Sequence, residues 1–191
     1  MKKIMIASLV GAIMMFIYQA LSWMVLPIHQ NSLKYTPHQD SVLRVLDASI
    51  AEDGMYYVPN SAPGTSMEEQ EKMREAMEGK PWAMIYFHKS HHHNMGIAMG
   101  LGFLYNFISM IIASIILQKA AASVHGFGSR WLLLMGLAVI IVLQSELMNW
   151  NWWQTPGHYL WGEVADDILA WALSGLWLAW YMGRQPKKKT I

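Results

Sequence analysis

The sequence predicts an all-α membrane protein with four transmembrane helices and a small extracytoplasmic α/β cap between the first and second helices. Two observations predict this fold class: the length of the apolar runs and the one-sided placement of the basic residues. A helix of about 20 apolar residues crosses the hydrocarbon core of a bilayer and satisfies its own backbone groups there. Runs of this kind occupy residues 4–28, 95–117, 131–150 and 159–183.

Basic residues flank these runs on one side only. Because Lys and Arg near the ends of spans stay in the cytoplasm, the protein is predicted to be multi-pass with both termini cytoplasmic. Residues 118–130 then form a short cytoplasmic loop, residues 151–158 a short outer loop, and residues 29–94 lie outside. The eight flanking residues have no Asp or Glu among them: Lys2, Lys3, Lys119, Arg130, Arg184, Lys187, Lys188 and Lys189.

The same pattern divides the chain into four segments. Residues 1–28 are predicted to be the first transmembrane helix, an uncleaved signal anchor, because the apolar run continues to Pro27 and no small-x-small cleavage site follows it. The remaining segments are the extracytoplasmic cap (29–94), a three-helix transmembrane region (95–183) and a basic cytoplasmic tail (184–191).

Short helices and strands are predicted within the cap. Asp40 caps a helix over 39–51, and Ser66 with Glu69 forms a capping box that starts a helix over 67–78. Strands are predicted at 55–58 and 82–88. Two short strands bury little core by themselves, so the cap is expected to rest on the membrane helices or on a partner.

Two short stretches of the cap carry a family resemblance. The sequences PGTSMEE (63–69) and GKPWA (79–83), together with the predicted topology, resemble a family of small, uncharacterised bacterial four-span inner-membrane proteins with an extracytoplasmic insertion after the first span. The resemblance covers most of the chain. It implies a bacterial cytoplasmic (inner) membrane as the location and no known activity, so it assigns no functional residues.

Acidic residues in the last two runs are the main candidate site. Glu146 lies four residues inside Trp150, and Asp166 and Asp167 lie five and six residues inside Trp161. At 1.5 Å rise per residue they share a depth of about 6 to 9 Å below the outer interface. No Lys or Arg occurs from 131 to 183, so their charge must be balanced from elsewhere. The candidate cation or proton site is Glu146, Glu163, Asp166, Asp167 and His158.

An ionised carboxylate at that depth needs water, a proton, a metal ion or a basic partner. The predicted partners are His158 and the cap bases Lys80, Lys89, His88 and His91–His93. Three interpretations stay open: hydrated or structural acids, a proton or cation site, and a bound divalent metal. The first is favoured because the acids lie near the interface. Glu146 and one of Asp166 or Asp167 are expected to face the helix bundle, with Glu163 nearer the aqueous boundary.

Two further patterns have alternative interpretations. The run His91-His92-His93 is predicted to be a solvated, pH-sensitive patch rather than a metal site, because adjacent side chains point in different directions. Gly96 and Gly100 form a G-x-x-x-G pattern, which permits a close helix crossing either within the chain or in a homodimer.

The sequence contains no H-E-x-x-H, G-x-S-x-G or phosphate-binding loop, so no catalytic residue is nominated.

The predicted function is that of a non-enzymatic integral membrane protein, an accessory, assembly or interaction subunit. The alternative is a small transporter or a metal- or cation-binding membrane protein that uses the outer carboxylates. No cofactor is predicted, apart from a divalent cation as an option. The expected partners are the lipid bilayer and a protein partner or second copy. Nucleic acid is not expected, because the basic tail is interpreted as a contact with lipid headgroups.

Overall fold

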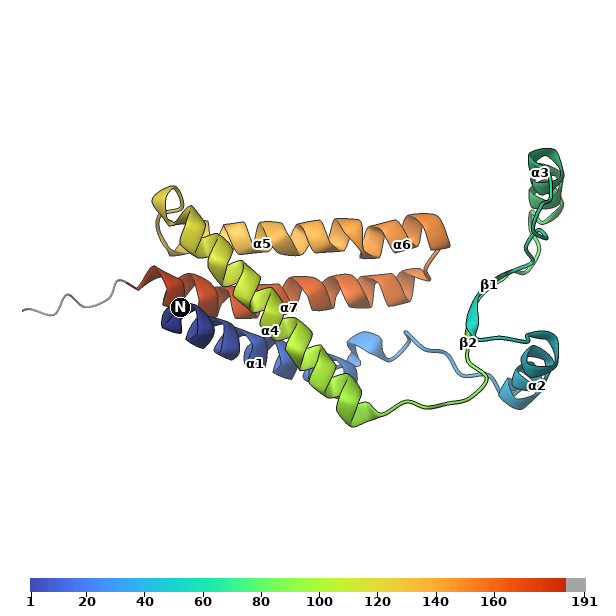
Figure 1. Cartoon of the computed structure of the whole chain (residues 1–191), viewed down its shortest axis with the longest axis horizontal. Coiled ribbons are helices and arrows are strands. Elements are labelled where there is room, and N and C mark those ends of the chain that lie inside the picture. Colours follow the sequence, from blue (N-terminus) through green and yellow to red (C-terminus); the bar gives the residue numbers. More distant parts are fainter. Residues whose placement is uncertain (185–191) are drawn as a thin grey trace, which may run out of the picture. The chain divides into compact units, whose positions relative to one another are not determined.

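The computed structural model describes residues 1–184, which form two units (Figure 1). The membrane unit comprises Met1–Lys34 and the described chain from Asn94 onward, and the outer unit comprises Tyr35–His93. Each unit is described by itself. Of the predicted basic tail, Arg184 is described, whereas Lys187, Lys188 and Lys189 lie outside the described residues.

Long helices build the membrane unit. They are α1 (Lys2–Met24), α4 (Met95–Lys119), α5 (Phe127–Gln144), α6 (Glu146–Trp153) and α7 (Gly157–Gly183), with 3-10 turns η1 (Pro27–His29) and η2 (Ala120–Ala122). Within residues 1–184, three helical stretches are long and apolar enough to cross a membrane: Lys2–Met24, Met95–Ala122 and Phe127–Trp153. This agrees with a multi-pass membrane protein. The fourth span, over α7, stays a prediction, because α7 carries three acidic residues within its 27.

The helix limits differ from the prediction at two places. The first helix ends at Met24 rather than at residue 28, because Pro27 lacks a backbone N–H and holds the preceding Leu26 in an extended conformation. The third run is not one regular helix. It is divided at Ser145 into α5 and α6, which run in line beside α7 (Figure 1).

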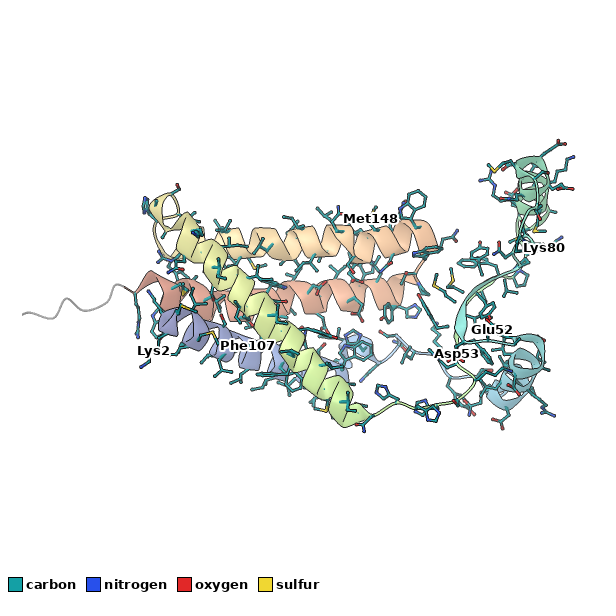
Figure 2. All side chains as sticks on the ribbon, viewed as in Figure 1. Lys2, Glu52, Asp53, Lys80, Phe107 and Met148 are labelled. Carbon is teal, nitrogen blue, oxygen red and sulfur yellow. The ribbon has the colours of Figure 1, made fainter. Side chains whose placement is uncertain are left out.

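The core of the membrane unit lies where α1 crosses α4 and α7, and where α5 packs on α7. Small residues permit the closest approach: a Cβ atom on Gly11 would lie 2.6 Å from Leu178 Cδ1 and 3.0 Å from Met110 Sδ. Gly100 of the G-x-x-x-G pattern has no such neighbour within 4 Å, so it makes no close crossing within this unit. The outward helix faces are apolar, as at Met148 on α6, which is 43% exposed (Figure 2).

The outer unit contains α2 (Gln39–Ser49), β1 (Gly54–Val58), α3 (Met67–Ala76) and β2 (Ala83–Phe87). These confirm the predicted helices and strands, with small differences at their ends. The strands pair antiparallel, with Gly54 opposite Phe87 and Val58 opposite Ala83. The capping box is also confirmed, because the Ser66 N–H donates to Glu69 Oε2 at 3.1 Å and the Glu69 N–H donates to Ser66 Oγ at 3.3 Å. These bonds lower the pKa of Glu69 below its ordinary value.

The outer unit has almost no core of its own. Phe87 is the one buried residue between positions 35 and 93. Neither α2 nor α3 buries a residue, and the apolar stripe of α2 leaves Val42, Leu43 and Val45 exposed by 49%, 58% and 64%. A structure of this kind gains little stability from burial within itself.

Candidate functional site

The four predicted acids do not share one environment. Asp166 is buried, Glu163 and Asp167 are half-buried, and Glu146 lies at the start of α6, where Ser145 Oγ donates to its Oε1 at 2.7 Å. Glu146 is close enough to Glu163 and Asp167 for electrostatic interaction with both. The structure therefore separates one fully enclosed carboxylate from three that are more accessible.

Asp166 accepts hydrogen bonds from three side chains of α1 and η1. Tyr18 OH donates to Oδ1 at 3.2 Å, and Ser22 Oγ donates to the same oxygen. His29 Nε2 lies 3.0 Å from Oδ2, and the His29 and Asp166 side chains are 3% and 9% exposed. Tyr18 and Ser22 are four residues apart on α1, which places both on the face that meets α7. Both oxygens of Asp166 are thus engaged within the chain.

The position of His29 follows from local sequence. Pro27 begins the 3-10 turn that ends at His29, and the turn brings the chain back against α7. Trp23 covers the imidazole, with ring centroids 3.9 Å apart and planes at 6°. On the opposite helix, a Cβ atom on Gly162 would lie 2.9 Å from His29 Cε1 and 3.0 Å from its Nδ1. A glycine at position 162 is therefore what gives the ring room beside α7.

The second nitrogen of His29 faces two polar groups. Its Nδ1 lies 3.2 Å from Ser32 Oγ and 4.0 Å from Glu163 Oε1. That Glu163 oxygen is buried and has no hydrogen-bond partner within residues 1–184, although Glu163 also interacts with Tyr159. Side chains from η1, the loop after it and α7 thus enclose one imidazole between two carboxylates.

The order Ser32, His29, Asp166 has the composition of a hydrolytic triad, but its geometry favours another use. A nucleophile must reach its substrate, and it works with donors placed for an oxyanion. Ser32 is 9% exposed, and its hydroxyl lies against the imidazole inside the membrane unit. A buried imidazole and carboxylate in contact can instead share a proton and hold two chain segments together.

Sequence reasoning did not nominate His29, Tyr18 or Ser22. The predicted partner His158 is exposed, and it makes no hydrogen bond or ion pair with any residue of the described chain. Two of the predicted cap bases pair within their own unit, His88 with Asp53 and Lys89 with Asp47. One sequence signal was present: the largely apolar α1 carries Tyr18 and Ser22 four residues apart, and His29 follows seven residues after Ser22.

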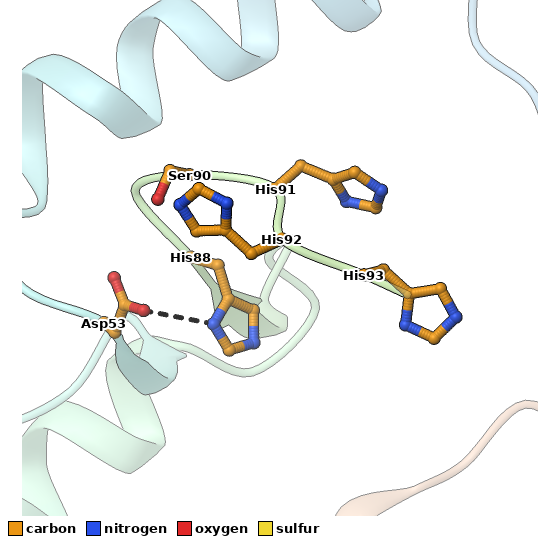
Figure 3. Close-up of a pocket in the computed structure, with 6 residues that line it drawn as sticks. All are labelled: Asp53, His88, Ser90, His91, His92 and His93. Carbon is orange, nitrogen blue, oxygen red and sulfur yellow. Dashed lines mark hydrogen bonds and ion pairs between the residues drawn. The ribbon is translucent and has the colours of Figure 1, made fainter. Parts of the chain in front are cut away.

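A second polar region lies in the outer unit, where Asp53, His88, Ser90 and His91–His93 line a pocket of about 440 Å³ (Figure 3). The Lys89 N–H donates to Asp53 Oδ1 at 2.9 Å, and His88 Nδ1 lies 3.2 Å from Asp53 Oδ2. These bonds lower the pKa of Asp53, the Lys89 N–H most strongly. The His92 ring points away from those of His91 and His93, whose ring centroids lie 6.2 Å apart (Figure 3). Within residues 1–184, no group of three or more His, Asp or Glu residues is placed to hold a metal ion.

No protein-family model matches the chain, and neither the curated proteins nor the solved structures contain a significant match.

Proposed function

We propose that this chain is a non-enzymatic, multi-pass membrane protein that acts as an accessory or interaction subunit and binds its partner through the outer unit. The observation that carries this proposal is the uncovered apolar stripe of α2. Val42, Leu43 and Val45 are all exposed, in a unit where Phe87 is the one buried residue. Fully burying one Val or Leu side chain contributes about 1.5–3 kcal/mol of favourable free energy. A partner that covers this stripe would therefore gain binding free energy from it.

The acid–base site supports a structural role for the membrane unit. Asp166, His29 and the two hydroxyls of α1 satisfy one another, which fixes the chain against α7 at the point where it leaves α1. Polar atoms that are already hydrogen-bonded within the chain are not available to a substrate. The site is therefore better suited to holding α1 and α7 together.

The proposal includes a fourth span over α7. Its 27 residues extend about 40 Å at 1.5 Å per residue, more than the hydrocarbon core of about 30 Å requires. The cost of burying Asp166 is reduced because His29 supplies a basic partner from the same chain. With the basic residues cytoplasmic, the proposed location is a bacterial inner membrane with both termini inside and residues 29–94 outside.

Site-specific photocrosslinking in native membranes tests the interaction. The crosslinker is placed at Leu43 in the apolar stripe, and at Arg44 on the opposite face of α2 as the matched control. We expect a covalent adduct of higher mass from position 43 and none from position 44. Crosslinks from position 43 to lipid, or to the chain's own membrane helices alone, would contradict a partner at this surface.

A cation-handling membrane protein is the second candidate function. It is favoured by one observation, the polar pocket that Asp167 lines within the membrane unit.

A further inference from the structure

Asp167 lines a partly open pocket of about 190 Å³ between four helices of the membrane unit. The polar lining residues are Gln19 from α1, Asn106 and Ser109 from α4, and Asp167 from α7. The other half of the lining is apolar and comprises Met15, Ile141, Ala170 and Trp171. A polar side chain inside a membrane-spanning bundle costs free energy unless it is hydrogen-bonded or contacts water or an ion. The convergence of such side chains from three helices therefore indicates that the pocket holds a ligand, water or a proton.

Each polar side chain of this pocket carries an oxygen that can accept a hydrogen bond or bind a cation. Asn106 Nδ2 donates to Gln19 Oε1 at 2.7 Å, which ties the two amides together and leaves Asn106 Oδ1 without a donor among the described residues. Asp167 makes no hydrogen bond or ion pair within residues 1–184, in contrast to the fully paired Asp166 beside it. No Lys, Arg or His of the described chain lines the pocket. An anion would therefore be repelled, and a cation would find acceptors.

We propose that this pocket binds a monovalent cation of the sodium type, with Asp167 as its charged ligand. Carboxylate, amide and hydroxyl oxygens are hard ligands that suit alkali and alkaline-earth cations rather than soft metals. One carboxylate balances one positive charge, which favours a monovalent over a divalent ion.

The size of the pocket sets the form of the bound ion. One water molecule occupies about 30 Å³ in the liquid, so 190 Å³ holds an ion together with a few waters. Waters then complete the coordination that Asp167, Gln19, Asn106 and Ser109 begin. This site is distinct from the His29–Asp166 pair, because adjacent residues on a helix point about 100° apart.

The test uses the full-length protein in lipid nanodiscs at constant ionic strength, with choline chloride replaced stepwise by sodium chloride. Thermal unfolding and isothermal titration are both measured. We expect sodium, but not choline, to raise the unfolding temperature saturably, because a ligand that binds only the folded state stabilises it. Asp167→Asn is expected to weaken sodium binding by more than about 100-fold, beyond the roughly 10- to 100-fold typical of losing a supporting contact.

Glu146→Gln is the matched control, because it removes a nearby acid that does not line the pocket. It is expected to keep saturable sodium binding. If Asp167→Asn does not fold, Ser109→Ala gives the second measurement, with about 10-fold weaker binding expected. Equal responses of the wild-type protein to sodium and choline would overturn the proposal. A pH-dependent stability that ignores sodium and is abolished by Asp167→Asn would also overturn it, and would assign the pocket to a proton.

Discussion

His29 Nε2 lies 3.0 Å from Asp166 Oδ2, so the turn that follows the first helix is joined to the last helix across 137 positions of sequence. Both side chains are buried, and the remaining Asp166 oxygen accepts from Tyr18 and Ser22. Removing one partner of such a buried pair leaves the other polar group buried without a hydrogen-bond or charge partner. In a low-dielectric environment this strongly destabilises the folded state.

The first prediction concerns the energy of this pair. Asp166→Ala is expected to destabilise the membrane unit by roughly 3–5 kcal/mol, because it leaves His29 and two hydroxyls without their acceptor. The double variant with His29→Ala should lose less than the sum of the single losses, with a coupling of about 1–3 kcal/mol. Reversible unfolding in detergent measures all three variants. Additive losses would show that the two side chains are energetically independent.

The second prediction concerns the space beside His29. Gly162→Ala places a methyl group within 3.0 Å of the imidazole, so the ring must shift and the unit is expected to lose about 1–3 kcal/mol. Gly136→Ala on α5 is the control, since nothing lies within 4 Å of a Cβ there. It should change stability by no more than about 1 kcal/mol, in the stabilising direction. Thermal unfolding of both variants measures the change in stability. Equal losses of stability would contradict a specific role of Gly162 in making room for the His29 ring.

The third prediction concerns the pH dependence of the hairpin β1–β2. The pKa of Asp53 is lowered by the Lys89 N–H and by His88, so its ionised form is favoured in the folded state. Its stabilising effect is present above the ordinary pKa of 3.8 and is lost as pH falls below that value through the lowered pKa. The protection of the hydrogen-bonded β2 amides against hydrogen exchange, relative to their intrinsic exchange rates at each pH, should therefore fall in this range. Asp53→Asn should remove the pH dependence, whereas Asp40→Asn on α2 should retain it.

The fourth prediction concerns topology, and the absence of cysteine from the chain makes it testable by single-cysteine labelling. Asn60→Cys in the outer unit and Thr155→Cys between α6 and α7 should react with a membrane-impermeant maleimide in intact cells. Ala121→Cys between α4 and α5 should react only after the membrane is permeabilised. A phosphatase fused after Ile191 should be inactive. Labelling of position 121 from outside, or an active fusion, would contradict the four-span arrangement.

The elements of the outer unit were predictable because their signals are local. The capping box at Ser66 and Glu69 defines the start of α3 within four residues, and the β-rich stretch around Ile85 lies between Pro81 and polar residues. The end of α1 was harder to predict. Apolar composition continues to Ile28, and the helix stops earlier because the backbone preference around Pro27 overrides hydropathy.

By itself the sequence determined the helical elements, the three apolar stretches suited to a membrane and the isolated acids of the last two runs, because composition and periodicity along one segment define each of these. The tertiary structure alone decided which partner each acid meets. His29 reaches Asp166 because Pro27 turns the chain back and Gly162 leaves room for the ring. Asp167, one residue further, points into a pocket with Gln19 and Asn106. Contacts between residues so distant in sequence depend on how helices cross, and helix crossing depends on the packing of all the helices together.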